Sequence, residues 1–391
     1  MYTHLLSIAT TLPSTNISTA SLLSELGGKL SPSLVKTIQN MGVENRYSVL
    51  HNVREIILGK EEMQAATTAT ELGALAVKKS LACADVAPDQ VGLLIAVTNT
   101  QSRLLPGLAS DLMASLHGIL KPDISIINMQ GLGCAGLLKA VEVAQWYLFA
   151  NPNKKVLVVI SEAATPYTIK HLSCRQYYSF REIKAMADPS AEQLAMLRST
   201  EEVIQAFLFG DGAVALLLGS QNNRSGASFG SICHLTNENP DDANLLVMSD
   251  GGTEHPAING VPQYWMRREV PRRGTAYAEA TVKALLKQPQ LPINHLSQAK
   301  VCLMHTGSRK ILDGVSKKLG LSPRSPQVAL SLPNTSASSE TSGFRKEAIY
   351  QVALINHNTF YTATRDFSSE MRSPFRIIVT PPAGSIAKPR R

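Results

Sequence analysis

The sequence predicts an α/β fold whose two halves repeat one order of elements. Short apolar runs rich in β-branched residues, typical of buried strands, alternate with longer segments of helical spacing. A strand, helix and strand precede Cys134 in the first half, and the same order precedes Asn334 in the second. With 44% hydrophobic residues among 391, the chain can fill a large core.

Each expected element follows from its local pattern. Strands are expected where aliphatic and β-branched residues run together, at 91–97, 124–127, 156–160, 213–218, 300–304 and 327–332. Helices are expected where apolar residues recur at three- and four-residue spacing, at 65–82, 135–150, 276–287 and 310–319, with a charged helix-like stretch at 191–205.

No low-complexity linker separates independent modules, so we expect two intimately packed halves. The first, 1–220, carries Cys134, and the second, 221–391, carries His305 and Asn334. If the halves pack about a pseudo-twofold axis, the loops after equivalent strands converge. Cys134, His305 and Asn334 then meet at one centre.

The bulk composition argues against several classes of protein. The net charge of +8 is spread along the chain without a basic and aromatic nucleic-acid module. The five cysteines form no C-x-x-C pair and the histidines no HExxH pattern, so neither a disulfide framework nor a metal site is expected. Apolar runs are too short to cross a bilayer and the first residues do not resemble a secretion signal, so we expect a cytoplasmic protein without membrane insertion.

Cys134 lies in the turn Gly131-Leu132-Gly133-Cys134-Ala135-Gly136, between an expected strand and an expected helix. A thiol in the first turn of a helix faces unpaired N–H groups and the positive end of the helix dipole, which lowers its pKa. The position therefore favours a nucleophilic thiolate. A small buried hydrophobic residue is the alternative interpretation of an isolated cysteine.

A cysteine, a histidine and an asparagine, each at the end of an expected strand, suit acyl-thioester chemistry. Cys134 would attack a thioester carbonyl, while His305 and Asn334 would donate hydrogen bonds to the oxygen that gains negative charge. The same donors would stabilise the enolate of a decarboxylating extender. Alternatively, His305 is a structural residue and Asn334 belongs to a turn with a helix cap.

Several motifs identify a family resemblance. The chain resembles the thiolase-fold condensing enzymes, most of all type III polyketide synthases of the chalcone and stilbene synthase kind, and next the initiating ketoacyl-carrier-protein synthases III. The matching segments lie in the family's order between about residues 5 and 340: Met41–Tyr47, Gly133–Gly136, Phe209–Ala213, Glu269–Pro271, His305–Leu312 and Asn334–Ser339.

The resemblance implies a duplicated thiolase-like fold layered α-β-α-β-α, an acyltransferase activity and a homodimer. Acyl-CoA and malonyl-CoA would be the substrates, with acyl carrier protein as an alternative donor, and no cofactor would be needed. It also places Phe209 and Tyr264 as aromatic gatekeepers between the carrier tunnel and the acyl cavity, Glu162 on the cavity wall, and Arg46 as a candidate coenzyme A contact.

The chain departs from the family in three places. The segment between Glu162 and Phe209 is longer than expected, and either borders the tunnel entrance or forms a solvated surface insertion. Asn334 follows Pro333, where the family carries glycine. After about residue 340 the family's final helix and glycine-rich strand are not recognisable, which suggests a divergent C-terminus or a shifted reading frame after about Ser339.

Three alternative functions remain open. Gly131-x-Gly133-x-x-Gly136 satisfies the dinucleotide-binding fingerprint, with Glu162 at the end of the next expected strand, which would suit an NAD-dependent dehydrogenase. A thiolase-fold acyltransferase could transfer an acyl group without forming a carbon–carbon bond. The altered C-terminus would also suit an inactive partner subunit.

Overall fold

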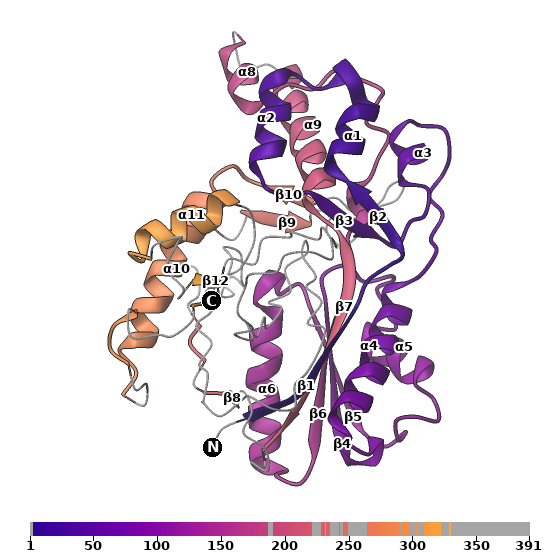
Figure 1. The fold of residues 1–391 in the computed structure, drawn as a ribbon, viewed down its shortest axis with the longest axis vertical. Coiled ribbons are helices and arrows are strands. Elements are labelled where there is room, and N and C mark those ends of the chain that lie inside the picture. The colour runs from indigo at the N-terminus through magenta and orange to yellow at the C-terminus, as the bar shows by residue number, and fades with distance from the viewer. Residues whose placement is uncertain are drawn as a thin grey trace, which may run out of the picture.

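A mixed six-stranded sheet is the centre of the structure, a computed structural model (Figure 1). The structure describes residues 3–186, 191–220, 228–230, 232–234, 242, 245–248, 264–289, 291, 293–296, 302–303, 309–321 and 328–329. The strand order is β5-β4-β6-β7-β1-β8, with β4 parallel to β5 and β6, and antiparallel pairing from β6 through β7 and β1 to β8. The strands are β1 (Thr3–Thr11), β4 (Val91–Thr98), β5 (Ser125–Gln130), β6 (Lys155–Ala163), β7 (Asp211–Gly219) and β8 (Ser228–Phe229).

Central strands β4, β6 and β7 are buried along almost their whole length and have continuous apolar middles because helices cover both faces of the sheet. Successive side chains point to opposite faces, so Leu94 and Leu157 pack in the core cluster beneath α4 and α5, and Ile95 and Val158 in the one beneath α6. The expected strands at 91–97, 156–160 and 213–218 are thus confirmed. The expected strand at 124–127 is observed as β5, which begins one residue later and extends to Gln130.

Helices α4 (Ala69–Ala84) and α5 (Leu108–Ser115) cover one face of the sheet, and α6 (Gly136–Ala150) covers the other (Figure 1). Helix α4 begins four residues later than the expected 65–82 because Thr68 caps it. The Thr68 hydroxyl accepts from the Glu71 N–H (3.1 Å), and the Glu71 carboxylate accepts from the Thr68 N–H (2.9 Å). Helix α6 confirms the expected helix at 135–150 to within a residue.

A cap stands at one end of the sheet (Figure 1). It comprises the antiparallel pair β2 (Thr15–Ser18) and β3 (Asn45–Ser48), with α1 (Thr19–Leu26), α2 (Pro32–Asn40), α3 (Val53–Ile57), α7 (Thr165–Thr168), α8 (Phe180–Ala185) and α9 (Ala191–Leu208). The charged stretch 191–205 is helical, as expected. Tyr177, Ile183, Val203 and Phe207 are buried, so the segment between Glu162 and Phe209 is part of the cap core and not a solvated insertion.

Apart from β8, which belongs to the large sheet, the described parts of the second half lie on the α6 side of that sheet (Figure 1). They include the pair β9 (Leu246–Met248) and β10 (Tyr264–Met266), the helices α10 (Val270–Leu286) and α11 (Arg309–Lys318), and the parallel pair β11 (Cys302–Leu303) and β12 (Val328–Ala329). Helix α10 begins before the expected 276–287 because Pro271 suits the first turn of a helix. Helix α11 agrees with the expected 310–319.

The arrangement of layers agrees with the thiolase-like α-β-α-β-α fold. Helices α4 and α5, the large sheet, α6, and then β11–β12 with α10 and α11 follow one another across the molecule (Figure 1). The short pair β11–β12 is parallel, as is β4–β5 in the first half, and lies within the expected strands 300–304 and 327–332. The boundary between 1–220 and 221–391 stays a prediction. The divergent end after about 340 lies outside the described residues.

Within the described ranges, no helix is both long enough and apolar enough to span a membrane. In the same part of the chain, His, Cys, Asp and Glu side chains form no group of three or more that could hold a metal ion.

Candidate active site

Cys134 lies in a glycine-framed turn between β5 and α6, as the sequence predicts. Gly131 and Gly133 have φ of 67° and 56°, a conformation that favours glycine, and Gly133–Ala135 form a 3₁₀ turn before α6 begins at Gly136. A Cβ atom at Gly136 would lie 2.6 Å from Val97 Cγ1, so the missing side chain lets the helix start approach β4. The half-buried Cys134 side chain is thus fixed at the N-terminal end of α6.

Glu162 and Asn99 form a hydrogen-bonded bridge to this turn. The Glu162 carboxylate, 2% exposed at the end of β6, accepts from Thr98 Oγ1 (3.3 Å), Thr100 Oγ1 (2.6 Å), the Asn99 N–H (3.0 Å to each oxygen) and Asn99 Nδ2 (2.8 Å). On its other side, Asn99 Oδ1 accepts from the Gly133 N–H (2.8 Å), and Nδ2 donates to the Gly133 carbonyl (3.3 Å). The bridge therefore links the ends of β4 and β6 to the residue before Cys134.

The electrostatics of Cys134 differ from the expectation based on the helix dipole alone. Burial and, second, the negative charge of Glu162 raise the pKa of the Cys134 thiol to about 12, although a backbone hydrogen bond acts in the opposite direction. The expected lowering of the pKa is therefore wrong for the described structure. The desolvation penalty and a neighbouring carboxylate both disfavour the thiolate more than the helix end favours it.

Phe209 follows α9 and is 5% exposed, in a small apolar cluster with Ala164 and Leu208. It therefore lies next to the segment that follows β6, and its role as a gatekeeper stays a prediction. Two residues later, the fully buried carboxylate of Asp211 accepts from the backbone N–H groups of Val49 (2.7 Å) and Thr165 (2.8 Å) and from the Thr165 hydroxyl.

Asp211 thereby joins the start of β7 to the segment after β3 and to α7. Burial raises the pKa of this carboxyl to about 6, while the hydrogen bonds from Thr165 and Val49 counteract the shift. Asp211, at the centre of the motif Phe209–Ala213, thus has a structural role, because its hydrogen bonds connect the cap to the sheet.

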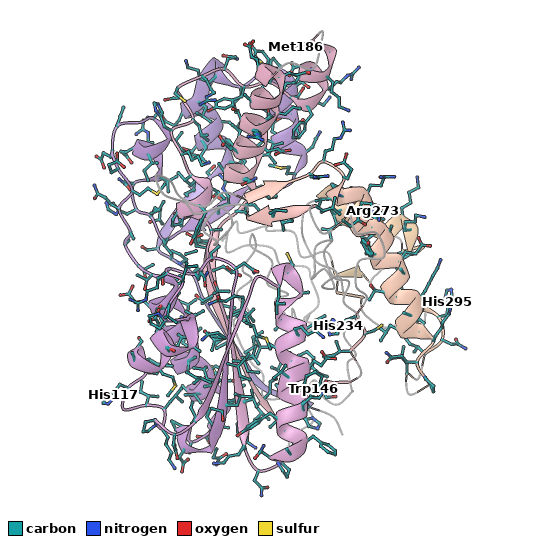
Figure 2. All side chains as sticks on the ribbon, turned by 180° about the vertical axis from the view of Figure 1, so that it is seen from behind. His117, Trp146, Met186, His234, Arg273 and His295 are labelled. Carbon is teal, nitrogen blue, oxygen red and sulfur yellow. The ribbon has the colours of Figure 1, made fainter. Side chains whose placement is uncertain are left out.

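Three predicted site residues are described only in part or not at all. Tyr264 begins β10, and the pair β9–β10 lies on the side of the molecule where α6 begins (Figures 1 and 2). The side chain of Tyr264 lies outside the description. His305 and Asn334 lie outside the described residues, so their convergence on Cys134 stays a prediction.

A partly buried ion pair holds the segment next to β9 on α10. Arg273, labelled in Figure 2, pairs with the Asp242 carboxylate, which also accepts from Tyr277 Oη (2.7 Å). These contacts, together with the pKa of Asp242 held low chiefly by Arg273, tie the two segments together. The ion pair contributes to the placement of the β9–β10 pair.

Sequence reasoning missed Asn99 and misjudged Arg46. The available signal for Asn99 was the polar run Thr98-Asn99-Thr100 at the end of a buried strand. Arg46 is only 2% exposed and donates to Thr19 Oγ1 (2.8 Å) and the Phe207 carbonyl (3.0 Å) inside the cap. The expected coenzyme A contact of an exposed arginine is therefore contradicted by its burial.

The geometry also opposes the dinucleotide-binding interpretation of the glycine motif. That motif binds pyrophosphate through free N–H groups at the start of a helix in a mostly parallel sheet. Here Asn99 accepts the Gly133 N–H, hydrogen-bond donors of β4 and its loop surround Glu162, and half of the sheet is antiparallel.

Comparison with known proteins gives one consistent family. Residues 14–170 match the family of FAE1/type III polyketide synthase-like proteins, a range that contains Asn99, Cys134 and Glu162. A β-ketoacyl-[acyl-carrier-protein] synthase III of Rhizobium rhizogenes strain K84 is 26% identical over 308 residues, covering 77% of this chain and 78% of the relative.

Solved structures share the fold at lower identity. A tetronic acid condensing enzyme aligns with a TM-score of 0.62 at 19% identity, covering 84% of each chain. The C-terminal type III polyketide synthase domain of a hybrid synthase from Dictyostelium aligns with a TM-score of 0.60 at 18% identity, covering 83% of this chain and 84% of that one. The chain is therefore similar to ketoacyl synthases III and type III polyketide synthases, and it shares the fold of these condensing enzymes.

Proposed function

We propose that the chain builds an acyl-cysteine at Cys134 from an acyl-CoA and extends it by decarboxylative Claisen condensation with malonyl-CoA. The product is a polyketide or 3-ketoacyl thioester. The observation that carries this proposal is the placement of Cys134, half-buried in a glycine turn at the start of α6 and held through Gly133 by Asn99.

The two half-reactions balance without an oxidant or a resident cofactor. In the first, the Cys134 sulfur bonds to the acyl carbonyl carbon and the coenzyme A thiol leaves with the thiol proton. In the second, malonyl-CoA loses carbon dioxide, and its enolate carbon attacks the acyl carbonyl and releases the Cys134 thiolate. His305 and Asn334 are proposed to stabilise the carbonyl oxygen in both steps.

The raised pKa of Cys134 assigns a further task to the site. A thiol with a pKa of about 12 carries little thiolate at neutral pH, so acylation requires a group that accepts its proton. We assign this task to His305, because an imidazole titrates in the range where general bases act.

Intact-mass spectrometry tests the proposal. Incubation with acetyl-CoA should add one acetyl group to the wild type and none to Cys134→Ala. Product analysis with malonyl-CoA then separates condensation from acyl transfer without carbon–carbon bond formation. An unmodified wild type under these conditions would favour an inactive partner subunit.

We further propose a homodimer formed through β5. This strand is at the edge of the sheet, and an unpaired edge is a template for pairing with a second chain. Apolar side chains are exposed there and in the loop before α5: Ile126 is 41% exposed, Leu104 72% and Leu105 85%. Acyl carrier protein as an alternative donor and a cytoplasmic location stay predictions.

A further inference from the structure

The turn that carries Cys134 has little rigidity of its own. Gly131 and Gly133 adopt positive φ, and Leu132 between them lies at φ −89° and ψ 0°. Glycine has the most backbone freedom to lose on folding. The position of the cysteine therefore depends on contacts from neighbouring elements.

Asn99 supplies such contacts from a loop 34 residues earlier in the chain than Gly133. Its side-chain amide satisfies both backbone groups of Gly133: Oδ1 accepts from the N–H at 2.8 Å and Nδ2 donates to the carbonyl at 3.3 Å. The carbonyl also accepts from the Gly136 N–H in the first turn of α6. The Asn99 side chain thus binds both the N–H and the carbonyl of Gly133, the residue directly before Cys134.

Glu162 fixes Asn99 in turn. Its buried carboxylate accepts from Asn99 Nδ2 at 2.8 Å and is itself held by the hydroxyls of Thr98 and Thr100. Since a carboxylate only accepts hydrogen bonds, the amide nitrogen of Asn99 must face Glu162, and the amide oxygen must then face the Gly133 N–H. The orientation of Asn99 is determined by chemistry as well as by shape.

Among the common side chains that fit this space, only an amide meets all three demands. Aspartate cannot donate to Glu162 and would bring a second negative charge beside it. Serine or threonine could donate one hydrogen bond to the carboxylate but is too short to hold both groups of Gly133. Alanine would leave the Gly133 N–H and one buried carboxylate contact without their partner.

We propose that Asn99 is a positioning residue for the condensation, which holds the Cys134 turn in the geometry of attack by linking it to the buried carboxylate of Glu162. The inference rests on the proposed role of Cys134 as the acyl acceptor. Because a displacement of about 1 Å at a reacting group can cost about 100-fold in rate, Asn99→Ala is expected to slow acylation of Cys134 about 10- to 100-fold.

Asn52 provides a matched control. Its buried amide makes the same three kinds of contact, donating to the Glu61 carboxylate (3.0 Å) and the Glu62 carbonyl (2.8 Å) and accepting from the Gln64 N–H (3.1 Å). These contacts lie in the loops around α3. Asn52→Ala therefore removes equivalent hydrogen bonds from the protein without touching the Cys134 turn.

The experiment compares full-length wild type, Asn99→Ala, Asn99→Asp and Asn52→Ala. Single-turnover acetylation by acetyl-CoA is followed by intact mass, alkylation of Cys134 by iodoacetamide is measured across pH by peptide mapping, and urea midpoints record stability. Slow acetylation in both Asn99 variants with a wild-type rate in Asn52→Ala supports the inference. In Asn99→Asp, the added carboxylate should also move the alkylation profile of Cys134 to higher pH.

The positioning role of Asn99 and the proposed function are contradicted by different results. Acetylation of Asn99→Ala at the wild-type rate, or equal slowing in Asn52→Ala, would overturn the positioning role while leaving the proposed function intact. If the wild type itself is not acetylated, the proposed function fails. The alkylation rate of Cys134, which needs no acyl donor, then still decides the role of Asn99: a rate in Asn99→Ala equal to that of the wild type at every pH overturns it.

Discussion

Replacing Gly136 by alanine should displace the turn that carries Cys134 from its position against β4. Gly136 has helical φ and ψ of −54° and −41°, so alanine is allowed by the backbone and the conflict is purely one of space. Its Cβ would lie 2.6 Å from Cγ1 of Val97, against an ordinary contact that begins at 3.4 Å. Helix α6 or Val97 must therefore shift by about 0.8 Å, the difference of these distances, at a site packed to interior density.

Val97 cannot yield easily because it is 2% exposed, in the core cluster beneath α6. Overpacking of this kind costs about 1–3 kcal/mol, and the better helix propensity of alanine offsets up to about 1 kcal/mol. We expect a net loss of about 1–2 kcal/mol in the free energy of unfolding. Because the turn moves with the helix start, acylation of Cys134 should also slow by about 10- to 100-fold.

Gly274→Ala is the matched control, since Gly274 lies inside α10 and an added Cβ would meet nothing within 4 Å. This variant should gain about 0.5–1 kcal/mol through helix propensity and should acylate as the wild type does. Urea unfolding and intact-mass kinetics measure both effects. A Gly136→Ala variant as stable and as reactive as the wild type would refute the argument that this glycine is required by the approach of α6 to β4.

The remaining predictions concern charge and assembly. Glu162→Gln keeps an acceptor for Asn99 but removes the charge that raises the pKa of Cys134, so iodoacetamide alkylation should shift to lower pH; an unmoved profile would contradict the electrostatic role. The folded-state pKa of Asp211, about 6, exceeds the ordinary value of 3.8, so the folded form binds a proton more tightly and stability is lost as pH rises from about 4 to 6. A shift of two pKa units corresponds to about 3 kcal/mol. The difference in unfolding free energy between the wild type and Asp211→Asn should therefore fall by up to this amount from pH 4 to pH 7. A difference that stays constant over this range argues against the raised pKa. Ile126→Lys places a charge on the exposed β5 edge and should shift light scattering from dimer to monomer mass, and the proposed interface is wrong if the variant remains dimeric.

The sequence predicts the sheet better than the cap. Strands β4, β6 and β7 each contain a continuous apolar run because helices cover both faces of the sheet, and this pattern can be recognised without any tertiary information. The turn at Cys134 was predictable for a similar reason, since its glycines mark positive φ between a strand and a helix.

The contacts around the cysteine were not predictable from local pattern. Asn99 lies 34 residues before Gly133 and 63 residues before Glu162 in the chain, so only the folded sheet brings these three residues together. The pKa of Cys134 depends on the same tertiary facts, burial and the charge of Glu162, and local reasoning from the helix dipole gave the wrong sign. Arg46 shows the same limit, because its sequence gives no sign that the cap encloses it.

The central claim is that Cys134 accepts an acyl group and passes it to a decarboxylated extender. The most direct measurement is peptide-mapped mass spectrometry of the full chain after incubation with acetyl-CoA, followed by addition of malonyl-CoA. The account predicts an acetyl group on Cys134, absent from Cys134→Ala, that disappears as a 3-ketoacyl product forms. An acetyl group found elsewhere, or a Cys134→Ala variant that still forms this product, would contradict it.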